Sequence, residues 1–204
     1  MAVKRVLDTA VAFGLLLVLS PVLLTTAAAV KLTSRGPILF KQERIGRNGS
    51  TFEMLKFRSM IVDNSDAEHR AMNQRELLGE DVADEDGVHK LANDPRFTPI
   101  GSVIRRYSID ELPQLWNVVR GEMALVGPRP SLDWEVELYD TRHRRRELVR
   151  PGLTGLWQVS GRNHLSMLQM LELDVQYVES LSLMGDMRIL LRTPAAVLSG
   201  GGAR

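Results

Sequence analysis

The longest apolar stretch of the chain lies near its N-terminus. Residues 9–30 (TAVAFGLLLVLSPVLLTTAAAV) contain no charged side chain. As a straight helix these residues span about 33 Å, which is enough to cross a hydrocarbon core of about 30 Å. The pattern therefore predicts a segment that enters a membrane.

Three interpretations compete for this segment. The first is a transmembrane helix, and the second is a cleaved signal peptide whose basic start is Lys4-Arg5. The third is a broken helix that enters the membrane and returns to the same side. Ser20-Pro21, in the middle of the run, favours the third, because proline removes a helical hydrogen bond and clashes with the preceding turn. Basic residues on both flanks also give no direction of crossing. We predict a re-entrant membrane helix over residues 1–35 and a catalytic domain over 36–204.

A hairpin pattern follows the apolar segment. Residues 38–45 (ILFKQERI) and 50–57 (STFEMLKF) are short strand candidates, and Arg47-Asn48-Gly49 lies between them. Asn-Gly is the strongest short hairpin signal. Residues 62–93 are acidic and have few large apolar side chains, so we predict a helix to about residue 78 and then a mobile insertion.

Helical spacing dominates the rest of the chain. Apolar residues recur at this spacing from 97 to 107, and Leu115, Trp116, Val118 and Val119 after Pro113 have the character of core residues. A buried strand is expected from Met123 to Val126. Helices are predicted at 131–150 and 165–184, and an amphipathic helix at the membrane interface or on the core near the C-terminus. The fold class is α+β, predominantly helical, with interface helices and a small β-hairpin or sheet.

Charge is balanced over the chain and uneven along it. The net charge is +1, which predicts no nucleic-acid binding. Residues 1–61 carry nine basic and three acidic side chains, which suits a phosphate-rich surface or ligand. The run at Arg142–Arg146 suggests a solvated face or contact with anionic lipid. The absence of cysteine excludes disulfides and thiolate chemistry.

The candidate chemistry lies at an adjacent acid pair, Asp110-Glu111. Arg105 and Arg106 precede it and Arg129 follows it. Carboxylates beside arginines suit a site for phosphates and a metal ion, and a carboxylate can itself attack phosphorus. The alternative is a helix capping box, because Ser108 and Glu111 have the S-x-x-E spacing. Pro113 argues against that alternative, since it would lie inside the capped helix.

Sequence blocks throughout the chain resemble the bacterial sugar transferase family, the monotopic polyprenyl-phosphate phosphoglycosyl transferases. The matching blocks are KRVLD at 4–8, the Ser20-Pro21 break, FKQERIGRNG at 40–49, KFRSM at 56–60, DPRFTPIGSVIRRYSIDELPQLWNVVRGEMALVGPRP at 94–130 and RPGLTGLWQVSGR at 150–162. The chain resembles the small form of the family, without the additional membrane helices of larger members.

The resemblance implies a function that spacing alone does not. Family members transfer sugar-1-phosphate from a UDP-sugar to polyprenyl (undecaprenyl) phosphate and release UMP, in the first membrane step of a surface glycan pathway. By this resemblance Asp110 is the nucleophile that carries a covalent phosphosugar in a ping-pong mechanism, Glu111 is its catalytic partner, and Asp110 is also the contact for Mg²⁺. The substrate- or phosphate-binding candidates are Arg105, Arg129, Arg162, Lys56, Arg58 and Gln158.

The resemblance also implies a location at the bacterial inner membrane, with the catalytic domain on the cytoplasmic side. The expected partners are a UDP-sugar, polyprenyl phosphate and membrane lipid. The sugar and the oligomeric state stay open, a homodimer included. Two rival functions are a membrane-anchored Mg²⁺-dependent nucleotide-sugar hydrolase, which needs no lipid acceptor, and a non-enzymatic anion-binding scaffold.

Overall fold

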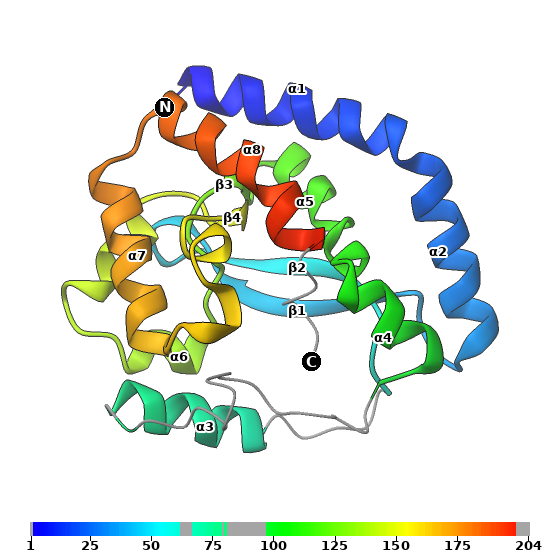
Figure 1. The fold of residues 1–204 in the computed structure, drawn as a ribbon, viewed down its shortest axis with the longest axis horizontal. Coiled ribbons are helices and arrows are strands. Elements are labelled where there is room, and N and C mark those ends of the chain that lie inside the picture. The colour runs from blue at the N-terminus through cyan, green and yellow to red at the C-terminus, as the bar shows by residue number, and fades with distance from the viewer. Residues whose placement is uncertain (1, 62–66, 79, 81–96, 199–204) are drawn as a thin grey trace.

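The computed structural model describes residues 2–61, 67–78, 80 and 97–198 (Figure 1). Its helices are α1 (Ala2–Val18), α2 (Ser20–Thr33), α3 (Ala67–Leu77), α4 (Pro99–Arg106), α5 (Gln114–Arg120), α6 (Asp133–Glu137), α7 (Met167–Glu179) and α8 (Leu183–Leu198). Its strands are β1 (Leu39–Ile45), β2 (Thr51–Phe57), β3 (Ala124–Val126) and β4 (Gly152–Thr154). Short 3-10 helices η1 (Arg47–Gly49), η2 (Ile109–Glu111), η3 (His143–Leu148), η4 (Trp157–Val159) and η5 (Arg162–His164) lie between them. The predicted class, mostly helical with a small antiparallel sheet, is confirmed.

Two small sheets organise the part of the chain that follows α2. Strands β1 and β2 form the predicted hairpin, in which Leu39 pairs with Phe57 and Ile45 with Thr51. Asn48 turns the chain in the left-handed region at φ 56°, where asparagine is better tolerated than most residues. Strand β3 confirms the expected buried strand, and it pairs in parallel with β4, which the sequence did not reveal.

The main core lies where these sheets meet α1, α5, α7 and α8. Leu115, Val118 and Met123 are almost completely buried within it, together with Ala12 of α1. In Figure 1, α1 and α8 run along one side of the molecule. Burying the inward face of α1 leaves its outward face apolar and exposed, as at Phe13, which is 53% exposed. The N-terminal helix is therefore part of the fold and also presents a second apolar face.

The predicted break in the N-terminal segment is present. Helices α1 and α2 are bent by 63° relative to each other, and Ser20 Oγ donates to the Leu17 carbonyl at 2.8 Å beside Pro21. Among the described residues no single helix has the length and hydropathy to cross a membrane, and this bent pair passes the same test only when taken together.

Two helix predictions were wrong. Residues 131–150 form only α6 and η3, and the helix predicted at 165–184 ends at Glu179 before α8 begins at Leu183. In the first case tertiary contacts override local preference, since Ser131 pairs with Ile45 as an isolated β-bridge. Trp116, expected in the core, is 49% exposed, because α5 turns this side chain away from the side that carries Leu115 and Val118.

The basic run at 142–146 is not simply a solvated face. Arg146 is buried and bonds Asp174 at 2.6 Å, whereas Arg142 and Arg145 form exposed ion pairs with Glu172 and Glu179. All three acidic partners lie on α7. The run therefore attaches η3 to α7. Of the predicted insertion at 62–93, helix α3 is present, and residues 62–66, 79 and 81–93 lie outside the described residues.

Candidate active site

The acid pair lies on η2, in a tight turn between α4 and α5. Thr98 caps the start of α4, where its hydroxyl accepts from the Gly101 amide at 3.0 Å. Ser108 then adopts a left-handed conformation, φ 54°, which reverses the chain directly before the acids. Such a conformation at a non-glycine residue is uncommon and clusters at functional sites. Asp110 is consequently buried, with 6% of its surface exposed.

The capping-box alternative is not what the structure contains. Ser108 makes no side-chain capping bond, and its carbonyl accepts from the Glu111 amide at 3.2 Å. Pro113 stands at the position that precedes α5, as its preference for a helix start predicts. The S-x-x-E spacing of Ser108 and Glu111 therefore does not form a capping box.

The surroundings of Asp110 perturb its ionisation. Burial, and then the neighbouring Glu111 carboxylate, raise the pKa of Asp110 to about 6, against the opposing effect of Lys56 and Arg105. A neighbouring negative charge and desolvation both disfavour the charged form of a carboxyl group. Raised values of this kind are found at sites that bind cations or perform chemistry.

Three of the predicted basic residues gather around the pair. Lys56 of β2 bonds Glu111 at 2.8 Å. Arg105, in the last turn of α4, attracts Asp110 and lies over the Phe97 ring at 5.0 Å. Burial lowers the pKa of Arg162 while Glu111 acts in the opposite sense, which brings this η5 residue within electrostatic range of the acids. Residues distant in sequence thus form one mixed-charge cluster.

Arg58 has a different position from the one its sequence neighbourhood suggested. It is 3% exposed, and its terminal nitrogens donate to the carbonyls of Ser34 and Arg35 at 2.8 Å. These carbonyls follow the end of α2, where helices leave carbonyl groups without partners. Arg58 therefore fastens the bent N-terminal helix pair to the end of β2.

Arg129 and Gln158 lie beside other groups. Arg129 lines a small pocket with the buried Asp174, and the Gln158 amide donates to the Leu153 carbonyl at 3.4 Å. The backbone of the segment Gly127-Pro128-Arg129-Pro130 is held by two buried arginines. Arg44 donates to the Pro130 carbonyl at 3.1 Å and Arg146 to the Arg129 carbonyl at 2.7 Å. Nothing in the local pattern around Arg44 or Arg146 predicts these two roles.

The glycines at 152 and 155 serve packing. A side chain at Gly152 would collide with the Gly127 amide, and one at Gly155 with the Gly127 carbonyl. The missing side chains at these two positions let β4 approach the end of β3.

The acid pair is the position at which the sequence predicts a metal contact. Among the described residues no group of three or more histidine or acidic side chains is arranged to hold a metal ion. Two carboxylates nevertheless fit Mg²⁺, which commonly binds one or two of them and completes its shell with water and substrate phosphates. The raised pKa of Asp110 fits the same interpretation, since a cation would favour its charged form.

The chain is similar to known proteins along nearly its whole length. Residues 1–200 match the family model described as bacterial sugar transferase. The chain belongs to this family. It is 43% identical over 200 residues to the exopolysaccharide production protein ExoY of Rhizobium meliloti (strain 1021), an alignment that covers 97% of this chain and 87% of that protein.

Two further sugar transferases carry more specific names. The undecaprenyl-phosphate galactose phosphotransferase of Salmonella typhimurium is 38% identical over 98% of this chain and 41% of its own length. The undecaprenyl-phosphate glucose phosphotransferase of Komagataeibacter xylinus is 41% identical over 93% of this chain and 35% of its own length. Family membership makes this chain an enzyme of the phosphoglycosyl transferase class.

Proposed function

We propose that this transferase moves sugar-1-phosphate from a UDP-sugar to undecaprenyl phosphate and releases UMP, with Asp110 as a covalent nucleophile. The observation that carries the proposal is the burial of Asp110 beside Glu111 within a cluster that includes Lys56 and Arg105. The names of the relatives from Salmonella typhimurium and Komagataeibacter xylinus support the acceptor. They differ in the sugar, so the sugar is left open here.

In the first step a carboxylate oxygen of Asp110 attacks the phosphorus that bears the sugar. A bond forms between this oxygen and phosphorus, and the bond to the bridging oxygen breaks, so that UMP leaves with the electron pair. Arg105 and Arg162 are suited to bind phosphate oxygens and to offset the repulsion between the substrate and the carboxylate. Lys56, paired with Glu111, adds positive charge on the β2 side.

In the second step an oxygen of undecaprenyl phosphate attacks the same phosphorus and Asp110 leaves as a carboxylate. The product is the lipid-diphosphate sugar. Because the two acceptors of the phosphosugar act in turn, one site serves both substrates and the kinetics are ping-pong. Mg²⁺ at Asp110 and Glu111, when bound, would neutralise phosphate charge.

The membrane is the source of the second substrate. Val30 of α2 is buried against Phe57 and Ile104, and Ile109 packs on the same cluster next to Asp110. The second half of the bent helix pair thus contacts the elements that carry the acids. This contact supports a re-entrant segment that holds the site at the cytoplasmic face of the inner membrane, near the phosphate of a membrane lipid.

The test is UMP release by the membrane-embedded enzyme with a panel of UDP-sugars and undecaprenyl phosphate. Asp110→Asn should abolish release, whereas Asp133→Asn, an exposed acid on α6, should leave it unchanged. Wild-type enzyme incubated with the correct UDP-sugar alone should release at most one UMP per chain and retain phosphosugar on Asp110. Continued turnover without lipid would instead identify a hydrolase, and normal turnover by Asp110→Asn would reject this nucleophile.

A further inference from the structure

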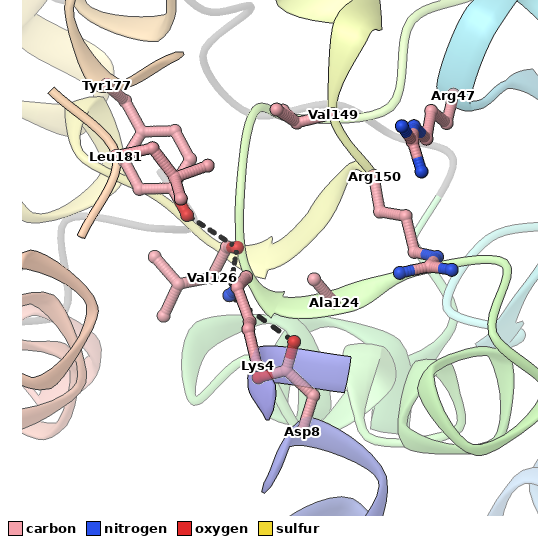
Figure 2. A pocket seen from close by; sticks show the side chains of 9 residues that line it. All are labelled: Lys4, Asp8, Arg47, Ala124, Val126, Val149, Arg150, Tyr177 and Leu181. Carbon is pink, nitrogen blue, oxygen red and sulfur yellow. Dashed lines mark hydrogen bonds and ion pairs between the residues drawn. The ribbon is translucent and has the colours of Figure 1, made fainter. Parts of the chain in front are cut away.

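A second cluster of cations lies at the start of α1. Lys4 and Asp8 of α1, Arg47 of the hairpin turn and Arg150 before β4 line one pocket. Figure 2 shows the guanidinium groups of Arg47 and Arg150 on the same side of this pocket, apart from Lys4 and Asp8. The cluster is formed by three segments that are distant in the sequence.

The two guanidinium groups are anchored in the same way. Arg47 Nε donates to the Leu148 carbonyl at 3.2 Å, and Arg150 Nε donates to the Gly121 carbonyl at 2.9 Å. Within the described part of the chain, the terminal nitrogens of both groups have no hydrogen-bond or ion-pair partner. Each arginine therefore presents a fixed fork of two donors, the geometry that binds phosphate oxygens in pairs.

The cluster has an excess of positive charge. Burial, and then repulsion from Arg5 and Arg47, lower the pKa of Arg150, and Asp8 offsets only part of this effect. Asp8 is itself paired with Lys4 at 3.3 Å. Arg5 is engaged with the end of α5, where it donates to the Val118 and Val119 carbonyls. An anion bound to the terminal nitrogens of Arg47 and Arg150 would reduce the repulsion between these arginines.

This cluster is separate from the acid pair. Arg5 and Arg150 bind at the C-terminal end of α5, whereas Asp110 lies before its N-terminal end. The seven residues of α5 rise about 10 Å between these ends. The phosphate that reacts at Asp110 is therefore about one length of α5 away from the end at which Arg150 binds.

We propose that Arg47 and Arg150 bind the phosphate group of a ligand at a second anion site, and that an acidic phospholipid of the surrounding membrane is its source. Apolar side chains on the neighbouring helices favour the lipid. Val3 and Val6 of α1 are 63% and 67% exposed, and Met184 and Met187 of α8 are 63% and 53% exposed. Lys4 joins these two helices through Asp186 at 2.7 Å. A binding site for an anionic lipid headgroup requires cations beside apolar side chains that contact the membrane, and this part of the molecule has both.

The test measures lipid retention rather than catalysis, so its failure is distinct from failure of the transfer reaction. Full-length enzyme in a neutral detergent is mixed with phosphatidylglycerol, and the lipid bound per chain is counted by native mass spectrometry. Arg47→Gln and the double variant Arg47→Gln/Arg150→Gln are compared with Arg145→Gln, which removes one exposed arginine charge that is paired with Glu179. Because Arg47 is exposed, its single variant should fold even if the double variant does not.

We expect the wild type and Arg145→Gln to retain phosphatidylglycerol, Arg47→Gln to retain several-fold less, and the double variant at least tenfold less. A second arm measures the shift in melting temperature with inorganic phosphate. Inorganic phosphate could raise the melting temperature in an Arg47-dependent way while no phosphatidylglycerol is retained. That result would support the anion site but would identify free phosphate, and not a phospholipid, as its ligand. Equal behaviour of Arg47→Gln and Arg145→Gln in both arms would overturn the proposal.

Discussion

Lys4 Nζ donates to the carbonyl oxygen of Val126 at 3.1 Å, across 122 residues of sequence. Tyr177 donates to the same oxygen at 2.9 Å, and both side chains also bond Asp186. Val126 ends β3 directly before the Gly127–Pro130 segment (Figure 2). The first turn of α1 is therefore attached to the backbone that leads to Arg129.

Replacement of Lys4 should destabilise the protein strongly. Lys4→Met leaves the largely buried Asp8 and Asp186 without their cation, and loss of one partner of a buried ion pair costs on the order of 3 kcal/mol. The melting temperature in detergent should fall clearly below that of Lys31→Met, which removes an exposed lysine from α2. Equal melting temperatures would show that the contact with α1 contributes little.

Asp110→Asn should stabilise the enzyme at neutral pH while it removes activity. The native pKa of about 6 exceeds the ordinary value of 3.8, so the native state binds the proton more tightly. Stability is consequently lost as pH rises from about 4 to 6, and the full cost, on the order of 3 kcal/mol, applies above that window. Without divalent cations, Asp110→Asn should melt above the wild type at pH 7.5 and close to it at pH 4. A lower melting temperature at pH 7.5 would contradict this account.

The rate of the first chemical step should depend on the same ionisation. Only the carboxylate form of Asp110 is a nucleophile, so single-turnover UMP release should increase with pH through a value near 6 in the free enzyme. Mg²⁺ should move this value down, because a cation favours the carboxylate. A rate independent of pH between 5 and 7.5 would exclude Asp110 as the titrating group.

The buried pair of Arg146 and Asp174 should matter more than its exposed neighbours. Asp174→Asn leaves Arg146 buried and without its counter-charge, at a cost of about 3–5 kcal/mol. Glu179→Gln breaks the solvent-exposed pair with Arg145 and should cost no more than about 1 kcal/mol. Melting temperatures of the two variants provide the comparison, and similar losses would contradict it.

The re-entrant arrangement predicts that both flanks of the N-terminal segment face the same side of the membrane. The chain has no cysteine, so single cysteines at Ala2 and Lys41, both exposed, can be labelled without background. Both should react with a membrane-impermeant reagent from the cytoplasmic side only. Labelling of the two positions from opposite sides would instead establish a helix that crosses the bilayer.

Features encoded by neighbouring residues were predictable. The hairpin followed from the Asn48-Gly49 turn signal between two short strand candidates, and the bend followed from Ser20-Pro21, since both depend on local backbone preferences. The acid pair was recognised as a candidate because its arginines and Pro113 lie close in sequence. The helix predicted over 131–150 was too long, because local preference does not reveal the contacts of Ser131 with Ile45 and of Arg146 with Asp174.

The sequence by itself determined the apolar broken segment, the hairpin, the acid pair and, through its resemblance, the family. Tertiary structure alone decided which arginines surround the acids and which hold the backbone. Arg58, Arg105 and Arg146 are the same residue type, yet Arg58 binds the end of α2, Arg105 favours the charged form of Asp110 and Arg146 is buried against Asp174. The physical reason is that the role of a charged side chain depends on the partners that folding brings to it and on its burial, and neither is contained in the local pattern.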